Sequence, residues 1–199
     1  MSFKILALLS TLFSLTALGA KTIPAGTYAI DNAHSKVGFE VPHLVIATVD
    51  GQFAKFDGTI TIDPKIDKSK ATLNIETISI NTNNKDRDDH LRSPDFFDAT
   101  KNPKITFISK KTVGTADNLK LIGDLTIKGT TKEVTLDVKY LGDVNDPYGN
   151  RKIAFAATAK INRKDFGLTW SKAVEAGPVV GDEVTLIIKI QASQPIKKG

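Results

Sequence analysis

The chain has no cysteine, and it contains one tryptophan and one methionine among its 199 residues. The absence of cysteine excludes disulfide bonds, thiol chemistry and a lipoprotein anchor, which needs a cysteine after the signal. Stability must therefore come from a hydrophobic core. A domain of this length can supply one, because it buries roughly 70% of the surface that its unfolded chain exposes.

Long hydrophobic runs are also scarce, and the exception lies at the N-terminus. Lys4 precedes an apolar and hydroxyl stretch from Ile5 to Leu18 that ends in small residues. This is the layout of a secretory signal peptide. The alternative is a membrane anchor, but the run is shorter than the roughly 20 apolar residues that a spanning helix needs. We expect residues 1–20 to be a cleaved signal peptide, residues 21–199 to form a single domain, and the mature chain to be secreted.

Charge of one sign is only weakly in excess, since the formal net charge is +5. Lysines are scattered singly along the chain, and the longest basic group after the N-terminal segment is a pair, as at Lys110–Lys111. Such scattering is typical of a solubilised surface and of protected strand edges. Nucleic-acid binding would need a basic stripe, so we expect no nucleic-acid partner.

Helical periodicity is nearly absent, and the dominant period is two. Val37, Phe39 and Val41, for example, alternate with polar or small residues, which indicates strands with one buried face. With a short strand around Tyr28 and a long one over residues 51–63 that Gly58 interrupts and bends, the pattern predicts about eight or nine strands. The other segments place on one parity Leu73, Ile75, Ile105, Phe107, Leu119, Leu121, Leu125, Ile127, Val134, Leu136, Val138, Tyr140, Ile153, Phe155, Ala157, Ala159, Ile161, Val184, Leu186, Ile188 and Ile190.

Most connections are short and rich in turn residues, so neighbouring strands should pair as antiparallel hairpins. The exception is the polar stretch from Asn81 to Pro103, in which residues 85–92 can form a short helix capped by Asn83 or Asn84. We expect this stretch to be a lid or crossover at one end of the sheet. Because open sheet edges promote aggregation, we expect the strands to close into a barrel and not to pack as two sheets.

A closed barrel of eight strands is just wide enough either to be filled by its own side chains or to hold one small ligand. Gly123, Ala157 and Ala159 on the inward parity would leave room along the axis. They would equally fit the taper of a solid core, so the pattern leaves both alternatives open. A hollow barrel with this aliphatic and phenyl lining would bind a hydrocarbon chain, and polar groups at its mouth would select the head group.

Five segments are unusually specific: Tyr28 to Ser35, Gly51 to Gly58, Arg87 to Asp98, Gly123 to Thr131 and Asn162 to Leu168. In this order and spacing they resemble the YceI-like family of bacterial secreted proteins, and the match covers the mature chain nearly end to end. The resemblance implies an all-β fold: an extended, lipocalin-like antiparallel barrel in the periplasm of Gram-negative bacteria. It also implies an apolar tunnel that holds a polyisoprenoid, an isoprenoid quinone or a fatty amide or acid, and a link to stress responses. Because of this family resemblance, we favour the hollow barrel over the solid core.

The expected function is therefore that of a periplasmic carrier or store, and the expected site is the tunnel wall with one end of the barrel. Trp170 is predicted to be an amphipathic plug at a barrel end, with its contact to ligand left open. The full set of expected ligand-binding residues is Phe39, Leu73, Ile75, Phe107, Leu121, Leu125, Val138, Phe155, Ala157, Trp170, Leu186, Ile188 and His90.

The polar residues of these segments allow two interpretations. Arg87, Asp88 and His90 lie within one helical turn, so they can contact a head group or hold the lid to the rim by ion pairs. We favour the structural role for Arg87 and Asp88 and leave His90 open.

Other polar residues are expected to be structural. Asp31 and Ser35 are predicted to form a turn, with His34 as a structural histidine. Arg163 and Asp165 are expected to pair across the last turn.

Two other classes of function have residues in their favour. Asp88, His90 and Ser93 supply the residue types of a catalytic triad, but they are crowded into one short segment, and no Gly-x-Ser-x-Gly turn is present. The three histidines lack the close spacing of a zinc site. We expect no enzyme activity, no metal and no cofactor other than the bound isoprenoid or fatty ligand. The alternative is a hydrolase or isomerase acting at the lid through Asp88 and His90. Transient membrane contact and a homodimer stay open.

Overall fold

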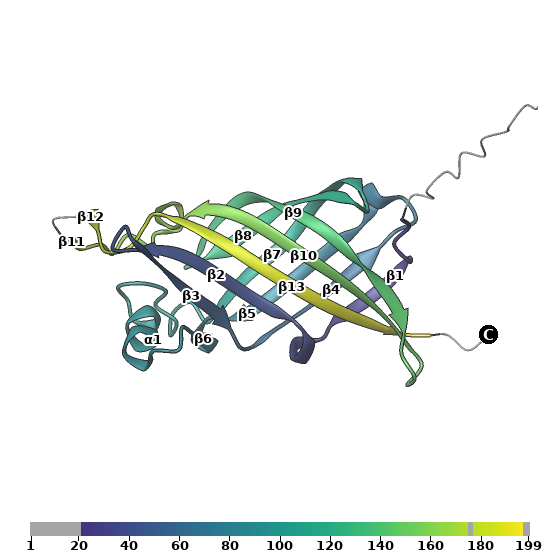
Figure 1. The fold of residues 1–199 in the computed structure, drawn as a ribbon, viewed down its shortest axis with the longest axis horizontal. Coiled ribbons are helices and arrows are strands. Elements are labelled where there is room, and N and C mark those ends of the chain that lie inside the picture. The colour runs from purple at the N-terminus through teal and green to yellow at the C-terminus, as the bar shows by residue number, and fades with distance from the viewer. Residues whose placement is uncertain (1–20, 175–176, 197–199) are drawn as a thin grey trace, which may run out of the picture.

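The computed structural model describes residues 21–174 and 177–196, so the predicted signal peptide lies outside the described residues. The described chain is almost entirely antiparallel strands, with one α-helix (Figure 1). The strands are β1 Gly26–Ile30, β2 Lys36–His43, β3 Ala47–Phe53, β4 Phe56–Ile62, β5 Lys70–Glu76, β6 Ile80–Asn81, β7 Lys104–Thr115, β8 Asn118–Ile127, β9 Thr130–Asn145, β10 Asn150–Asn162, β11 Ala173–Val174, β12 Gly177–Pro178 and β13 Glu183–Pro195. The helix is α1 Lys85–Arg92, and short 3-10 turns span Asn32–His34, Ile66–Lys68, Thr77–Ser79 and Arg163–Phe166.

Eight strands close into a barrel. Their order is β1-β4-β5-β7-β8-β9-β10-β13, and β13 returns to β1 through the pairs Ala29–Ser193 and Ile30–Ala192. Every one of these pairings is antiparallel. The all-β, closed-barrel prediction is confirmed.

The sheet extends beyond the ring at one end. β2 pairs with β13 beside residues 185–189, and β3 and β6 follow it outward. We call the end of the barrel that carries α1 the lid end, and the end formed by the β9–β10 connection the hairpin end. The two lie at opposite extremes of the elongated molecule in Figure 1.

The prediction of one long strand over residues 51–63 was wrong. The chain leaves the sheet at Ala54 and Lys55, whose N–H groups donate to the carbonyl and the hydroxyl oxygen of Ser79. β3 therefore pairs with β2, while β4 pairs with β1 and β5. Gly58 lies inside β4, where a Cβ would stand 2.1 Å from the Thr72 carbonyl oxygen, so glycine serves close strand approach there and not a strand break.

The lid spans residues 81–103 and contains α1, as predicted. Asn84 caps this helix, since its side chain accepts from the N–H of Arg87 at 3.0 Å. Phe96 and Phe97 follow the helix and are buried against the barrel. Among the described residues, no helix has both the length and the apolar character needed to cross a membrane.

Candidate binding cavity

The barrel is hollow. A cavity of about 230 Å³ runs between the strands from Ile62 near the hairpin end to Leu168 at the lid end. Its lining is almost wholly aliphatic and phenyl. All of the strand residues expected to face a ligand lie in its wall, namely Phe39, Leu73, Ile75, Phe107, Leu121, Leu125, Val138, Phe155, Ala157, Leu186 and Ile188. That they touch a ligand stays a prediction.

One detail of the predicted lining is corrected. Gly123 was expected to leave open space, but a Cβ at Gly123 would stand 2.7 Å from the ring of Phe107. The Phe107 ring therefore occupies the room over this glycine. Phe39 covers Gly51 in the same way, at 2.2 Å from a Cβ there. These glycines make room for the tips of two phenyl rings, and the axial space is left beside residues such as Ala157.

Two hydroxyl groups of the wall are paired with backbone groups. The Thr112 hydroxyl donates to the carbonyl of Ser69 at 2.9 Å, and the Ser69 hydroxyl accepts from the N–H of Asp63 at 3.0 Å. A hydrocarbon beside these residues would leave no buried hydrogen bond broken, because each of the two hydroxyls already has a partner.

One charged group buried at the lid end is Arg163, which is 3% exposed. Its guanidinium donates to the carbonyls of Gly181 (2.8 Å), Trp170 (2.8 Å), Val180 (3.3 Å) and Leu168. It also pairs with Asp182 at 3.2 Å. Burial lowers the pKa of this guanidinium, and the Asp182 carboxylate opposes the shift.

These contacts tie down the segment that we call the strap, residues 168–174 and 177–182. The predicted pair of Arg163 with Asp165 was wrong, because the fork of Arg163 points into the strap and its carboxylate partner is Asp182. Five donors in one planar group suit several carbonyls at once, so a single arginine can fix a loop that has little regular structure.

A second cavity of about 310 Å³, which we call the vestibule, lies between the lid and the strap. It shares Phe39, Val41, Leu91, Phe96 and Val180 with the wall of the tunnel. The vestibule therefore stands at the mouth of the tunnel, and it adds the polar groups that the tunnel lacks: His43, Asp86, Arg87 and His90.

His90 and Trp170 lie in the vestibule, and Trp170 thus lies at a barrel end, as the sequence predicted. Their rings meet edge to face at a centroid distance of 5.0 Å, and Phe96 packs 5.0 Å from His90 and 5.2 Å from Trp170. The His90 Nε2 lies 3.0 Å from a carboxylate oxygen of Asp95. This aromatic cluster narrows the mouth between lid and strap.

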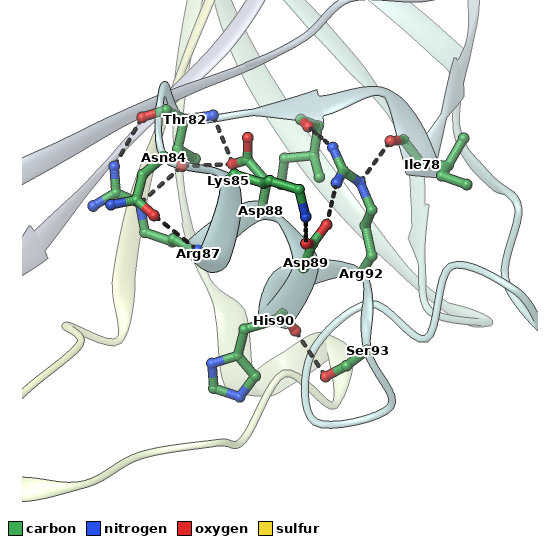
Figure 2. Close-up of polar contacts among 11 residues, drawn as sticks. Ile78, Thr82, Asn84, Lys85, Arg87, Asp88, Asp89, His90, Arg92 and Ser93 are labelled. Atoms are coloured by element: carbon green, nitrogen blue, oxygen red, sulfur yellow. Dashed lines mark hydrogen bonds and ion pairs between the residues drawn. The ribbon is translucent and has the colours of Figure 1, made fainter.

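Arg87 and Asp88 are structural, as favoured from the sequence, although hydrogen bonds and not ion pairs hold them. Figure 2 shows both side chains converging on Thr82. Asp88 accepts from the N–H (2.8 Å) and the hydroxyl (2.6 Å) of Thr82, and Arg87 donates to its hydroxyl and carbonyl, each at 2.8 Å. Arg92 adds bonds to the carbonyls of Ile78 (2.9 Å) and Ile80 (2.6 Å).

The residue types of a catalytic triad do not form one. The carboxylate of Asp88 is buried against Thr82, and the Ser93 hydroxyl donates to the backbone carbonyl of His90 at 2.7 Å (Figure 2). The His90 ring has Asp95 as its partner. A nucleophile, a base and an orienting carboxylate in series are therefore not assembled from Asp88, His90 and Ser93.

His34 belongs to the turn that precedes β2. The Nδ1 atom of His34 lies 2.7 Å from a carboxylate oxygen of Asp31, and Asp31 also caps the 3-10 turn Asn32–His34. Ser35 bonds to Gln191. The predicted turn and structural histidine are confirmed. In the described part of the chain, no group of three or more His, Asp or Glu side chains could hold a metal ion.

Some wall residues were missed from the sequence. Leu91, Phe96 and Phe97 come from the lid, and Ile30 and Ile66 come from strand ends and turns. The adjacent pair of phenylalanines in an otherwise polar segment was an available signal, because a polar lid has no other reason to carry them. Ile30 and Ile66 carry no such signal, since no alternation surrounds them.

Fold and cavity together define a class: closed antiparallel barrels with an apolar axial cavity open toward one end. The YceI-like domain matches residues 28–192 of this chain, which therefore belongs to the YceI-like family. Protein YceI of Shigella flexneri is 39% identical over 193 residues, covering 94% of this chain and 97% of that protein. Protein YceI of Salmonella newport is 40% identical over 175 residues, covering 85% and 88%.

Solved structures agree with the fold. BcnA of Burkholderia cenocepacia superposes with a TM-score of 0.73 at 26% identity, covering 82% of this chain and 99% of that chain. The YCEI protein of Campylobacter jejuni gives 0.67 at 35% identity, covering 84% and 96%. A polyisoprenoid binding domain from Saccharophagus degradans gives 0.61, covering 84% and 98%, and at 17% identity it shows the fold alone.

Proposed function

We propose that this chain binds the hydrocarbon tail of one long-chain amphiphile in the barrel and holds it unchanged, as a carrier or store in the periplasm. The observation that carries the proposal is the closed barrel's apolar cavity, whose wall is almost wholly aliphatic and phenyl and whose Ser69 and Thr112 hydroxyls are already paired. An unfilled apolar space of this kind is poorly suited to water and well suited to hydrocarbon.

The energetics allow the tail to supply the affinity. Burial of each CH2 group stabilises by about 0.8 kcal/mol, so ten to fifteen carbons contribute roughly 8 to 12 kcal/mol before the cost of association. The vestibule would then hold the head group beside Trp170, Arg87 and His90. Polar contacts there would choose among head groups more than they would tighten binding.

Polyisoprenoids and isoprenoid quinones are the first ligands to test. The Saccharophagus degradans domain of the same fold is described as polyisoprenoid binding. The family resemblance points to the same chemical class, and the signal-like segment at residues 1–20 motivates the periplasmic location. A link to stress responses is a further part of this proposal.

The test is extraction of the purified protein with organic solvent, followed by mass spectrometry, and then a titration with a series of alcohols of increasing chain length. We expect one chain to co-purify, and we expect the affinity for the alcohols to rise about fourfold per added CH2 until the tunnel is full.

Three results would contradict the proposal. The first is repeated ligand-free preparations that take up no quinone or fatty chain, and the second is an affinity that does not depend on chain length. The third is a change in the mass of a ligand after incubation, because that result would mean catalysis and not storage.

A further inference from the structure

The hairpin between β2 and β3 ends in three consecutive apolar residues that point into solvent. Leu44 is 36% exposed, Val45 60% and Ile46 91%. None of the three lines the tunnel or the vestibule. We call these residues the apolar tip. Three adjacent exposed aliphatic side chains at one turn differ from the single exposed apolar residues that are ordinary on a protein surface.

The backbone of the apolar tip makes its composition more unusual. Leu44 and Val45 adopt positive φ angles of 51° and 67°. Glycine and asparagine are the residues that occupy such positions in hairpins, and a β-branched residue with positive φ is an outlier. Neither turn geometry nor solubility favours leucine and valine at these positions, so we infer that these residues serve a function.

The strap holds the hairpin in place. The N–H of Leu44 donates to the carbonyl of Val179 at 3.0 Å, and the N–H of Gly181 donates to the carbonyl of Pro42 at 2.8 Å. A β-bridge joins His43 to Val180. The apolar tip is therefore presented by a hydrogen-bonded base that reaches back to the same strap that Arg163 binds.

The two segments that form the apolar tip and its base contain no formally charged residue. Neither residues 41–49 nor residues 177–181 contain an aspartate, glutamate, lysine or arginine. Both segments also contribute to the vestibule, through Val41, His43, Val49, Val179 and Val180. The exposed apolar tip thus stands beside the mouth of the cavity, on two segments without charged residues.

We propose that the apolar tip inserts into the interfacial region of a lipid bilayer and so docks the mouth of the barrel against the membrane. A bilayer suits a small protruding apolar group on a hairpin without charged residues, because the acyl boundary accepts apolar side chains at shallow depth. A second copy of the chain fits less well, since a stable dimer buries roughly 800 Å² per partner and a tip of three residues offers far less. The inference goes beyond cargo binding, because docking needs no ligand in the tunnel.

The test is flotation of the full mature chain with phosphatidylcholine vesicles, at low and at high salt. The variant V45N/I46S removes two apolar side chains and places asparagine where φ is positive, so it should fold at least as well as the parent. The matched control is V144S, because Val144 is also 60% exposed but lies beside the hairpin end. We expect V45N/I46S to lower the vesicle partition coefficient about tenfold or more and V144S to change it less than twofold.

Partition that persists at high salt supports insertion of an apolar group. Absence of vesicle binding by the parent, equal losses in both variants, or binding that needs anionic lipid and disappears in salt would each overturn the proposal. Analytical ultracentrifugation gives one more outcome, a concentration-dependent dimer that V45N/I46S abolishes, which would assign the apolar tip to a second copy instead. Chain binding in the tunnel is measured separately without vesicles, so its failure and the failure of docking are distinguishable.

Discussion

The two ends of the barrel are closed by different kinds of interaction. At the hairpin end, Tyr28, Ile153 and Ala192 are fully or almost fully buried and do not line the tunnel, so side chains fill the space. At the lid end, hydrogen bonds of buried or half-buried arginines hold the covering segments in place. There, Arg163 holds the strap and Arg92 holds the lid, and the vestibule is left between them.

This difference between the two ends indicates where the barrel can open. A core of packed apolar side chains resists change over its whole volume, because every atom lost leaves a void. The strap and the lid are held in large part by hydrogen bonds of Arg163 and Arg92, so they can separate while the barrel stays folded. We expect ligand to enter and leave at the lid end.

The largest effect should follow from removal of Arg163. Arg163→Ala leaves the carbonyls of the strap and Asp182 without their buried donor, and we expect a loss of about 3 kcal/mol or more in the free energy of unfolding. Lys164→Ala is the control, since Lys164 binds the same Asp182 at 2.7 Å from an exposed position and should cost about 0–1 kcal/mol. Urea denaturation measures both. Equal losses would mean that the strap does not depend on Arg163.

The second prediction concerns the tunnel between the two ends. Ala157→Phe places a ring in the cavity, and we expect tail binding to weaken tenfold to about a hundredfold with little loss of stability, because the space is already present. Ala156→Phe is the matched control, since its side chain lies on the opposite face of β10. Titration with a fluorescent fatty probe measures both variants. Unchanged binding by Ala157→Phe would contradict the assignment of the tunnel.

The third prediction concerns the hairpin end. The Tyr140 hydroxyl donates to Asp143 at 2.5 Å, and burial, with Asp143, raises the pKa of Tyr140 above its ordinary value. Tyr140→Phe should therefore cost about 1 kcal/mol near neutral pH and leave tail binding unchanged.

The pH dependence of this cost has a definite sign. Because the folded-state pKa of Tyr140 is raised, its contribution to stability is complete below the ordinary tyrosine pKa of about 10. The contribution declines as the pH rises beyond that value toward the folded-state pKa. The thermal midpoints of parent and Tyr140→Phe should therefore converge at alkaline pH, and a difference that grows there would contradict this assignment.

The smallest effect should appear beside the lid. Thr77 is 1% exposed, and its hydroxyl has no hydrogen-bond partner among the described residues. Thr77→Val keeps the shape and removes the unpaired group, so we expect a gain of about 1 kcal/mol or less in the free energy of unfolding. A measured loss would mean that the hydroxyl is bonded in solution. The result sharpens the comparison because this unfavourable polar group belongs to the lid end.

Much of the tunnel could be predicted because strands alternate their side chains. Once residues such as Phe155 and Leu186 are assigned to strands, a period of two leaves only two faces, and the apolar one must face inward. The lid helix was predictable for an equally local reason, since Asn84 supplies a cap directly before the first turn.

The rest depended on partners that are distant in the chain. Arg163 lies 19 residues from Asp182, and local spacing favoured the nearer Asp165 instead. The break between β3 and β4 depends on Ser79, which is 24 residues from Lys55. Leu44, Val45 and Ile46 are apolar, yet they form an exposed tip.

The order of polar and apolar residues by itself determined the class of fold, the inward face of each strand and the oily character of the interior. Only the tertiary structure decided that the interior stays hollow, that it opens between lid and strap, and which carboxylate neutralises Arg163. The physical reason is that alternation is a local property of an extended backbone. A void and a buried ion pair, in contrast, exist only where segments far apart in the chain meet.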